Sequence, residues 1–374
     1  MALDLVFCGT YTDPSRQAGF TVTPERPVMG MTGPTGSEGI YVLARDRETG
    51  ALTKVGSTAS VNPSFLTLDR AGRFLFAVNE VRDFDGAGSG AVSSFALDRD
   101  TGSLRFLSQV ASGGGNPCHL SLSHDGRHLL VANHEAGTVA VIPVSEDGLL
   151  SPLVDLRQDE AVDHRRAHAH FITPDPTGAF VLSADTGTDR VMIYRQDGPS
   201  GRLVAHDPPW GQTHPGGSPR HLAFDPTGKY LFANGEADLT LSVFRFDATA
   251  GRLDYAGSGR TVDDGVDTEG HSTAQMLVHP SGRFVYVANR GTDTIAVFRF
   301  DAASADMALL ALVPTRGQTP RNFEIDPSGA WLYVANQNSD AIESFAIDAA
   351  TGALRHVGRA ATVPAPTCIR FLVP

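Results

Sequence analysis

Histidine, arginine and glutamate side chains recur at fixed distances from six turn glycines in this 374-residue sequence. Eight residues after the successive glycines lie Glu80, His134, Thr186, Glu236, Arg290 and Gln337. Eight residues before them lie Ser64, Cys118, His170, Arg220, Ala274 and Arg321, and two residues further upstream lie Asn62, Asn116, His168, Ser218, Ser272 and Thr319. Guanidinium groups offer forked donors to a carboxylate or phosphate, whereas histidine and glutamate can exchange protons near neutral pH. These residue types together indicate general acid–base chemistry on a small anionic molecule.

The glycines belong to a pattern that is repeated along the chain. They are Gly72, Gly126, Gly178, Gly228, Gly282 and Gly329, at spacings of 54, 52, 50, 54 and 47 residues. Two of the six copies read NPCHLSLSHDGRHLLVANH from Asn116 and STAQMLVHPSGRFVYVANR from Ser272. Self-similarity at about 50 residues is typical of a β-propeller.

Each copy predicts four antiparallel strands, which is one propeller blade. An alternating strand opens the copy, a DPTG or DPSG turn follows, and a strongly apolar second strand ends in a polar residue. Runs such as 294–300 (TIAVFRF) and 239–246 (LTLSVFRF) supply the third strand. A turn such as ATAGRL leads to the fourth.

The two ends of the chain should complete a seventh blade. The first 61 residues contain three strand-like runs, and residues 363–374 contain one more, APTCIRFLVP. Pairing them would cover edges that are otherwise exposed. We therefore expect a single all-β domain over residues 1–374, a seven-bladed propeller closed by both termini. Residues 14–37 interrupt the split blade and are expected to form a surface loop, either a lid, a subunit contact or a tolerated insertion.

The hairpin formed by the first two strands locates the polar positions. The start of the first strand and the end of the second must lie at the same end of a blade, so all blades together should form one ring at a mouth of the central channel. This ring would bring together Glu80, His134, His168, His170, Arg220, Glu236, Arg290 and Arg321. Two other interpretations stay open: the arginines and glutamates could pair to lock neighbouring blades, or the three histidines could ligate a metal.

Composition excludes several classes of protein. The net charge of −12 argues against binding nucleic acid or anionic membrane through the general field. No apolar run of 18 residues and no signal-like start is present, so we expect a cytoplasmic protein.

Cys8, Cys118 and Cys368 form no CxxC or zinc spacing and are expected to be small buried residues in a reducing compartment. No nucleophile elbow, GxGxxG segment or metal motif appears, so we expect no cofactor and no metal.

Several strings resemble those of a known family. They include GTYT (9–12), FAVNE (76–80), HAHFITPDPTG (168–178), SPRHLAFDPTG (218–228) and HPSGRFVYVANRGTDTIAVF (279–298). Nearly the whole chain resembles the seven-bladed lactonase propellers, which include 6-phosphogluconolactonases of a bacterial type and a fungal muconate lactonising enzyme.

The resemblance implies four catalytic residues, His168, Arg220, Glu236 and Arg290. We expect Arg321, His170, Glu80, His134 and Gln275 to bind substrate. Two of these depart from the family pattern, because Gln275 stands where relatives often carry a glutamate and His134 where an aromatic residue is common. The departures put the substrate in doubt but not the fold.

The resemblance further implies lactone hydrolysis, most plausibly of 6-phosphogluconolactone. Arg220 would polarise the ring carbonyl and Arg290 with Arg321 would hold the anionic substituent, while Glu236 or His168 would take a proton from water. A muconate-type cycloisomerase and a non-catalytic binding module are the alternatives. The partner expected is a small anionic lactone, with no nucleic acid and no membrane; the sequence does not determine the oligomeric state.

Overall fold

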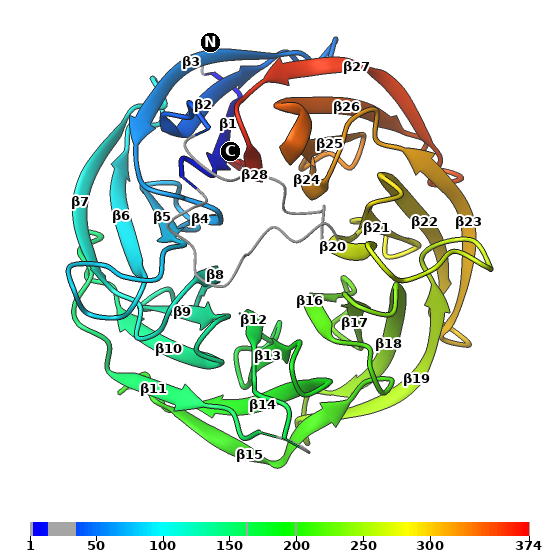
Figure 1. The fold of residues 1–374 in the computed structure, drawn as a ribbon, viewed down its shortest axis with the longest axis horizontal. Coiled ribbons are helices and arrows are strands. Elements are labelled where there is room, and N and C mark those ends of the chain that lie inside the picture. Colours follow the sequence, from blue (N-terminus) through cyan, green and yellow to red (C-terminus); the bar gives the residue numbers. More distant parts are fainter. Residues whose placement is uncertain (1–2, 14–34, 162–163, 199, 374) are drawn as a thin grey trace.

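Seven four-stranded antiparallel sheets surround one central axis (Figure 1). The computed structural model describes residues 3–13, 35–161, 164–198 and 200–373. The seven-bladed propeller expected from the repeat is therefore confirmed. Within the described part of the chain, no helix has the length and apolar character needed to cross a membrane.

The blades follow the order of the sequence, and the first strand of each blade contacts the first strands of its neighbours around the axis. The first three are built from β28 (Pro366–Phe371), β1 (Leu5–Thr10), β2 (Gly39–Arg45), β3 (Leu52–Ala59); β4 (Leu66–Leu68), β5 (Phe74–Asn79), β6 (Ala91–Leu97), β7 (Leu104–Ala111); and β8 (Pro117–Leu122), β9 (His128–Asn133), β10 (Thr138–Pro143), β11 (Asp155–Gln158). The next two are built from β12 (Ala169–Pro174), β13 (Val181–Asp185), β14 (Arg190–Gln196), β15 (Leu203–Gln212); and β16 (Pro219–Phe224), β17 (Tyr230–Gly235), β18 (Thr240–Asp247), β19 (Arg252–Arg260). The last two are built from β20 (Ser272–Val278), β21 (Phe284–Arg290), β22 (Thr294–Asp301), β23 (Asp306–Pro314); and β24 (Pro320–Ile325), β25 (Trp331–Asn336), β26 (Ala341–Ile347), β27 (Leu354–Thr362), with a short 3₁₀ turn at Gln337–Ser339.

The two chain ends share the first blade, as expected. Strand β28 pairs antiparallel with β1, and Val6 lies opposite Phe371. Of the expected insertion, residues 14–34 lie outside the described residues. Its described ends are tied together, because the backbone N–H of Thr35 donates to the carbonyl of Thr12 at 3.0 Å.

The D-P-T-G turns join the first and second strands by a fixed set of hydrogen bonds. In the fifth blade, Asp225 Oδ1 accepts from the backbone N–H of Tyr230 at 2.8 Å, and its Oδ2 accepts from Thr227 Oγ1 at 2.6 Å. Gly228 closes the turn with a φ of +69°, a conformation that other residues rarely adopt. Because β16 and β17 pair antiparallel, with Pro219 opposite Gly235, this turn lies at the end of the blade opposite Arg220 and Glu236.

Packing between the faces of neighbouring blades forms the core. Every residue of β21 is buried, whereas β3 on the rim is largely exposed. Between the fifth and sixth blades, Phe232 packs in one apolar cluster with Val285 and Phe298. Burying each such side chain contributes about 1.5–3 kcal/mol, so the second and third strands can be apolar on both faces.

A β-bulge recurs near the start of the innermost strand. Register shifts occur in β8, β12, β16, β20 and β24, for example between Pro219 and His221. A bulge places two residues against one on the partner strand and re-aims their side chains. Arg220 and His221 are one such pair, and both contribute to the central channel.

Several of the polar residues that open the copies lie outside extended strand. Asn62, Asn116, Ser218 and Thr319 have φ values of 41°, 53°, 48° and 56°. A left-handed residue ends the extended alternation of a strand. Asn62 instead ties chain segments together, as its Oδ1 accepts from the backbone N–H of Thr12 at 3.0 Å.

Candidate active site

Arg220, Glu236 and Arg290 converge from two neighbouring blades. Arg220 lies at the bulge of β16, Glu236 directly follows β17, and Arg290 ends β21. Arg220 Nε donates to Glu236 Oε1 at 3.2 Å, and Arg290 Nη2 donates to the same oxygen. Both arginine side chains are almost fully buried, while a quarter of the Glu236 side chain is exposed.

A second ion pair lies at the same ring. Arg321 is 3.7 Å from Glu80, and both side chains are buried. Tyr11 joins them: its hydroxyl donates to Glu80 Oε2 at 2.9 Å, and the Arg321 guanidinium lies 4.9 Å from the centre of its ring. Tyr11 directly follows β1 and so occupies the position that Glu80 and Glu236 occupy in their own blades. Counting from turn glycines missed it, because the first blade has no such turn before β1; the GTYT string was the available signal.

The charges of this cluster do not cancel. Burial raises the pKa of Glu236, but the charges of Arg290 and Arg220 outweigh that effect and hold the pKa at about 2. Burial lowers the pKa of Arg220 to about 9, although Glu236 opposes the shift, so both groups are charged at neutral pH. Together with Arg321 and Glu80, this cluster holds three arginines beside two glutamates, which is an excess of one basic side chain among these five.

The histidines form a contiguous group beside the ion pairs. His168 Nδ1 lies 2.9 Å from the carbonyl oxygen of His134, and the two rings are 5.0 Å apart. A carbonyl only accepts, so Nδ1 carries the proton and the neutral ring keeps a free lone pair on Nε2. Burial lowers the pKa of His134 to about 4 and that of His170 well below its usual value. Among the described residues, no three or more His, Cys, Asp or Glu side chains are grouped as a metal site.

A second ring of side chains closes the channel below the first. Phe65, His119, Phe171 and His221 come from four blades, with ring centres 4.2 Å apart for Phe65 and His119 and 3.7 Å for His119 and Phe171. Phe171 and His221 are 5.0 Å apart. Burial holds the pKa values of both histidines well below their usual range. The arrangement supplies a water-poor floor under the charged groups.

The second ring lies seven residues before the turn glycines, and Gln275 belongs to it. The resemblance to the lactonase propellers pointed to Gln275, whereas counting from the turn glycines gave Ala274 and missed His119 and His221, because strict alternation points adjacent residues to opposite faces. The bulge described above removes that restriction. Arg220 Nη1 accordingly lies 3.0 Å from His221 Nε2 and also donates to the carbonyl of Ala274 at 2.9 Å.

Several buried polar atoms of these rings lack a well-formed hydrogen bond to the protein. They are Ser64 Oγ, His170 Nδ1, His221 Nδ1, Gln275 Oε1, Arg290 Nε, Gln337 Oε1 and Thr367 Oγ1. Buried polar atoms without partners are costly, at about 1–3 kcal/mol each. The set contains hydroxyls, amide oxygens, imidazole nitrogens and one cationic N–H group, so it suits a ligand that both donates and accepts hydrogen bonds.

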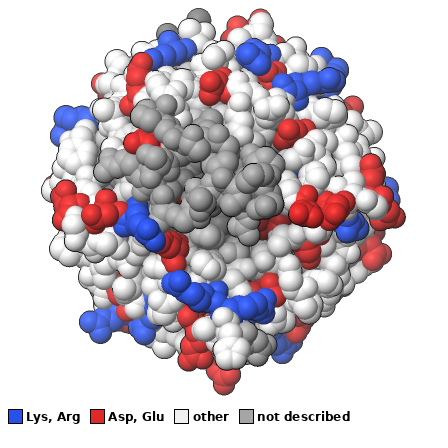
Figure 2. Space-filling model, viewed as in Figure 1, with Lys and Arg blue, Asp and Glu red and all other residues white. Residues whose placement is uncertain are grey.

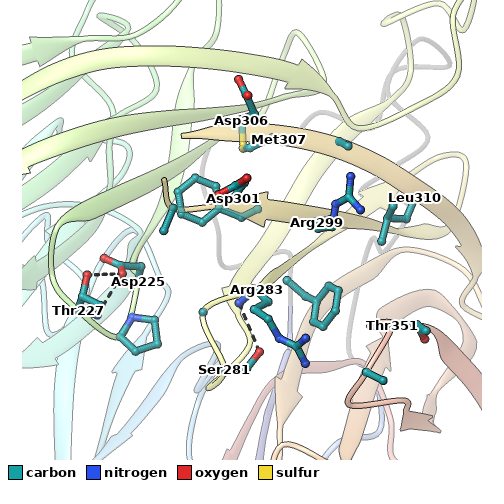
Figure 3. Close-up of a pocket in the computed structure, with 17 residues that line it drawn as sticks. Asp225, Thr227, Ser281, Arg283, Arg299, Asp301, Asp306, Met307, Leu310 and Thr351 are labelled. Carbon is teal, nitrogen blue, oxygen red and sulfur yellow. Dashed lines mark hydrogen bonds between the residues drawn. The ribbon is translucent and has the colours of Figure 1, made fainter. Parts of the chain in front are cut away.

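A separate cavity of about 1030 Å³ lies at the other end of the blades (Figure 3). Its walls include the turn residues Asp225 and Ser281 and the side chains of Arg299 and Leu310, and no member of either ring lines it. Figure 3 shows Arg299 and Leu310 side by side, away from the two turns. The cavity is therefore distinct from the candidate active site.

Lys, Arg, Asp and Glu side chains are interspersed around the periphery of the face drawn in Figure 2. No broad basic patch stands out among the described residues of that face. An anion would therefore depend on the local arginines of the ring rather than on the general field.

Comparison with known proteins agrees with the fold. The family described as "Lactonase, 7-bladed beta-propeller" matches residues 6–371. The 6-phosphogluconolactonase of Bacillus subtilis strain 168 is 32% identical over 343 residues, which are 90% of this chain and 95% of that protein. The periplasmic gluconolactonase PpgL of Pseudomonas aeruginosa superimposes with a TM-score of 0.87 at 31% identity, over 100% of this chain and 99% of that one. A Bacteroides fragilis protein described as a candidate 6-phosphogluconolactonase gives a TM-score of 0.86 at 28% identity, over 100% and 98%.

The geometry defines the class of protein: a seven-bladed propeller with a ring of charged side chains at the mouth of its central channel. The chain belongs to the lactonase family of seven-bladed β-propellers, and it is a lactone hydrolase by that membership.

Proposed function

We propose that the protein hydrolyses a small anionic sugar lactone, 6-phosphogluconolactone, at the mouth of its central channel. The observation that carries the proposal is the convergence of Arg220 and Arg290 on Glu236 at the ring that also holds His168 in one tautomer. The named activity of the Bacillus subtilis relative supports the substrate class.

The excess of arginine over glutamate in the ring favours an anionic substrate. The phosphate of a sugar lactone, with a charge of about −1.5 to −2 at pH 7, is such a group. The buried amide oxygens of Gln275, beside His221, and of Gln337, which accepts no hydrogen bond from the described residues, favour hydrogen-bond donors, which sugar hydroxyls supply and carboxylates do not. We assign the anionic substituent to Arg290 and Arg321, with His170, Glu80, His134 and the two glutamines near the sugar hydroxyls.

His168 is the general base in this proposal. The pKa of about 2 makes Glu236 a weak base, since a carboxylate paired with two arginines gains little by taking a proton. His168 presents a lone pair on Nε2 and is half-buried, so water can reach it. Glu236 serves to orient the two guanidinium groups.

The reaction then follows from these positions. His168 takes a proton from water, and the oxygen of that water attacks the lactone carbonyl carbon. Arg220 donates hydrogen bonds to the developing oxyanion, a kind of stabilisation worth about 2.7–4 kcal/mol. The ester C–O bond breaks, His168 returns its proton to the departing ring oxygen, and the product carboxylic acid releases a proton to solvent. The aromatic floor of the channel limits the access of bulk water.

The test is acid release from 6-phosphogluconolactone in a pH-stat, corrected for spontaneous hydrolysis. We expect His168→Gln to lower kcat by about 10²–10⁴-fold, while His124→Gln, an exposed histidine in a turn at the far end of the blades, leaves kcat unchanged. No acid release from this lactone or from gluconolactone would overturn the proposal. Ring closure of a muconate, seen as loss of dienoate absorbance, would then indicate a cycloisomerase, and inactivity with a tightly bound protein partner would indicate a binding module.

We also propose a cytoplasmic location. Cys8, Cys118 and Cys368 are all free and buried, which suits a reducing compartment. Since the Pseudomonas aeruginosa relative is named periplasmic, fractionation of the native host is the test. Recovery from the periplasm would contradict this location.

A further inference from the structure

We propose that His221 is a positioning residue for Arg220, and that it directs Arg220 Nη2 towards the carbonyl oxygen of the lactone. The inference rests on the proposed role of Arg220 in polarising that carbonyl. His221 lies in the floor of the channel, below the charged ring, and takes no part in the proton transfers described above.

The protein occupies two of the three guanidinium nitrogens of Arg220. Nε donates to Glu236 Oε1 at 3.2 Å. Nη1 carries two hydrogens, one directed at His221 Nε2 at 3.0 Å and one at the carbonyl of Ala274 at 2.9 Å. Nη2 has no acceptor among the described residues. Its two N–H groups are therefore the ones that Arg220 can offer to a substrate oxygen.

The hydrogen bond from Nη1 fixes the protonation state of His221. A guanidinium group only donates, so His221 Nε2 must accept, and the proton of the neutral ring lies on Nδ1. Burial, assisted by the charge of Arg220, keeps the pKa of His221 well below its usual value. A doubly protonated ring would instead turn an N–H group towards Nη1 and repel the guanidinium.

One buried amide holds both acceptors of Nη1 in place. Asn234 Oδ1 accepts from the backbone N–H of His221 at 3.0 Å, and Asn234 Nδ2 donates to the carbonyl of Ala274 at 3.0 Å. The Asn234 side chain thereby ties β16 to β20 across the boundary between the fifth and sixth blades. Because a guanidinium group is planar and rigid, fixing Nε and Nη1 also fixes the direction in which Nη2 points.

Other rings pack around the imidazole of His221. Its ring centre lies 5.0 Å from that of Phe171, 5.5 Å from that of His170 and 6.0 Å from that of His119. Only 3% of His221 is exposed. A ring in such close packing has little room to change its orientation, so Nε2 is a fixed acceptor for Arg220.

The first test detects the ring proton of His221 by NMR of the histidine-labelled full chain without lactone, near neutral pH. With the signals assigned from a His221→Gln spectrum, we expect Nδ1 to be protonated and Nε2 unprotonated. His279 is the reference with the opposite pattern, because its Nε2 donates to the carbonyl of Gly329 at 2.9 Å and its Nδ1 accepts from the backbone N–H of Ser281 at 3.1 Å. Arg220→Met should shift the Nε2 signal of His221, which loses its donor, and leave His279 unchanged.

This NMR result does not depend on turnover, so it separates the inference from the proposed function. A proton on His221 Nε2, or a His221 signal that does not move in Arg220→Met, would overturn the inference even in an active lactonase. If the wild type released no acid from a lactone, the proposed function would fail, and the NMR result alone would decide whether His221 holds Arg220.

The second test compares two replacements of equal length. Glutamine can place an amide oxygen where His221 Nε2 lies, whereas methionine offers only a weak acceptor. His221→Met should lower kcat by about 10–100-fold, the effect of losing a hydrogen bond to a charged group, with KM nearly unchanged. His221→Gln should retain most of the wild-type kcat.

A double variant distinguishes positioning from a general effect on the fold. In an Arg220→Met background, His221→Met should cause no further fall in kcat, because its effect passes through Arg220. Equal losses in His221→Met and His221→Gln would overturn the inference. A fall in the Arg220→Met background as large as that in the wild type would overturn it as well.

Discussion

Replacing Arg220 by methionine should remove most of the turnover while leaving the propeller folded. The methionine side chain fills much of the same space but donates no hydrogen bond. If Arg220 stabilises the oxyanion, kcat should fall by about 10²–10³-fold, the effect of losing one oxyanion donor.

The cost in stability can be worked from the contacts of Arg220. Glu236 keeps Arg290 as its partner, and the carbonyl of Ala274 keeps the side chain of Asn234 at 3.0 Å. Only His221 Nε2 loses its donor, which costs about 1–3 kcal/mol. The variant no longer buries a guanidinium whose pKa is lowered to about 9 by that burial, which offsets part of the loss. The net change should therefore stay well below the ~5–15 kcal/mol by which domains are stable.

The assay is acid release at saturating lactone, paired with thermal unfolding of the same sample. Arg299→Met is the matched control, because Arg299 is an exposed arginine in the separate cavity. An Arg220→Met protein that unfolds normally and turns over at the wild-type rate would refute the assignment of Arg220 to the reacting carbonyl.

The remaining predictions concern stability, binding and metals. Glu236→Gln should lower the free energy of unfolding by about 2–4 kcal/mol at pH 7, since two buried guanidinium groups lose their carboxylate. The pKa of Glu236 is about 2 in the folded protein against an ordinary 4.5. Its contribution to the free energy of unfolding is therefore complete above pH 4.5 and is lost as the pH falls towards 2. Urea titrations across that range should show this loss of stability in the wild type and not in the variant. Tyr11→Phe removes the hydroxyl from Glu80 but keeps the ring under Arg321, so steady-state kinetics should show KM rising several-fold with kcat nearly unchanged. Dialysis against a chelator should leave acid release unchanged, and activity restored only by an added divalent cation would contradict that expectation.

The fold could be predicted because each repeat contains, in its own sequence, the turn and strand patterns that form one blade. The D-P-T-G turn at Asp225, the apolar second strand and the spacing of about 50 residues recur locally, so the blades and their orientation follow from the chain. The convergence of Arg220, Glu236 and Arg290 follows in turn from that orientation. The partnership of the two arginines with one carboxylate oxygen is a matter of side-chain geometry, which counting along strands does not determine.

The features that the sequence did not reveal arise from departures from regular strands. The bulge in β16 brings His221 beside Arg220, and left-handed residues such as Asn62 interrupt the alternation of the strands. Tyr11 was not predicted because its blade is assembled from both chain ends, so no turn glycine precedes it from which its position could be counted.

A crystal structure with the product 6-phosphogluconate tests the central claim most directly. We predict that its new carboxylate lies within hydrogen-bonding distance of Arg220 and His168, with the phosphate at Arg290 and Arg321. A product molecule bound only in the separate cavity beside Arg299, with the ring unoccupied, would contradict the account.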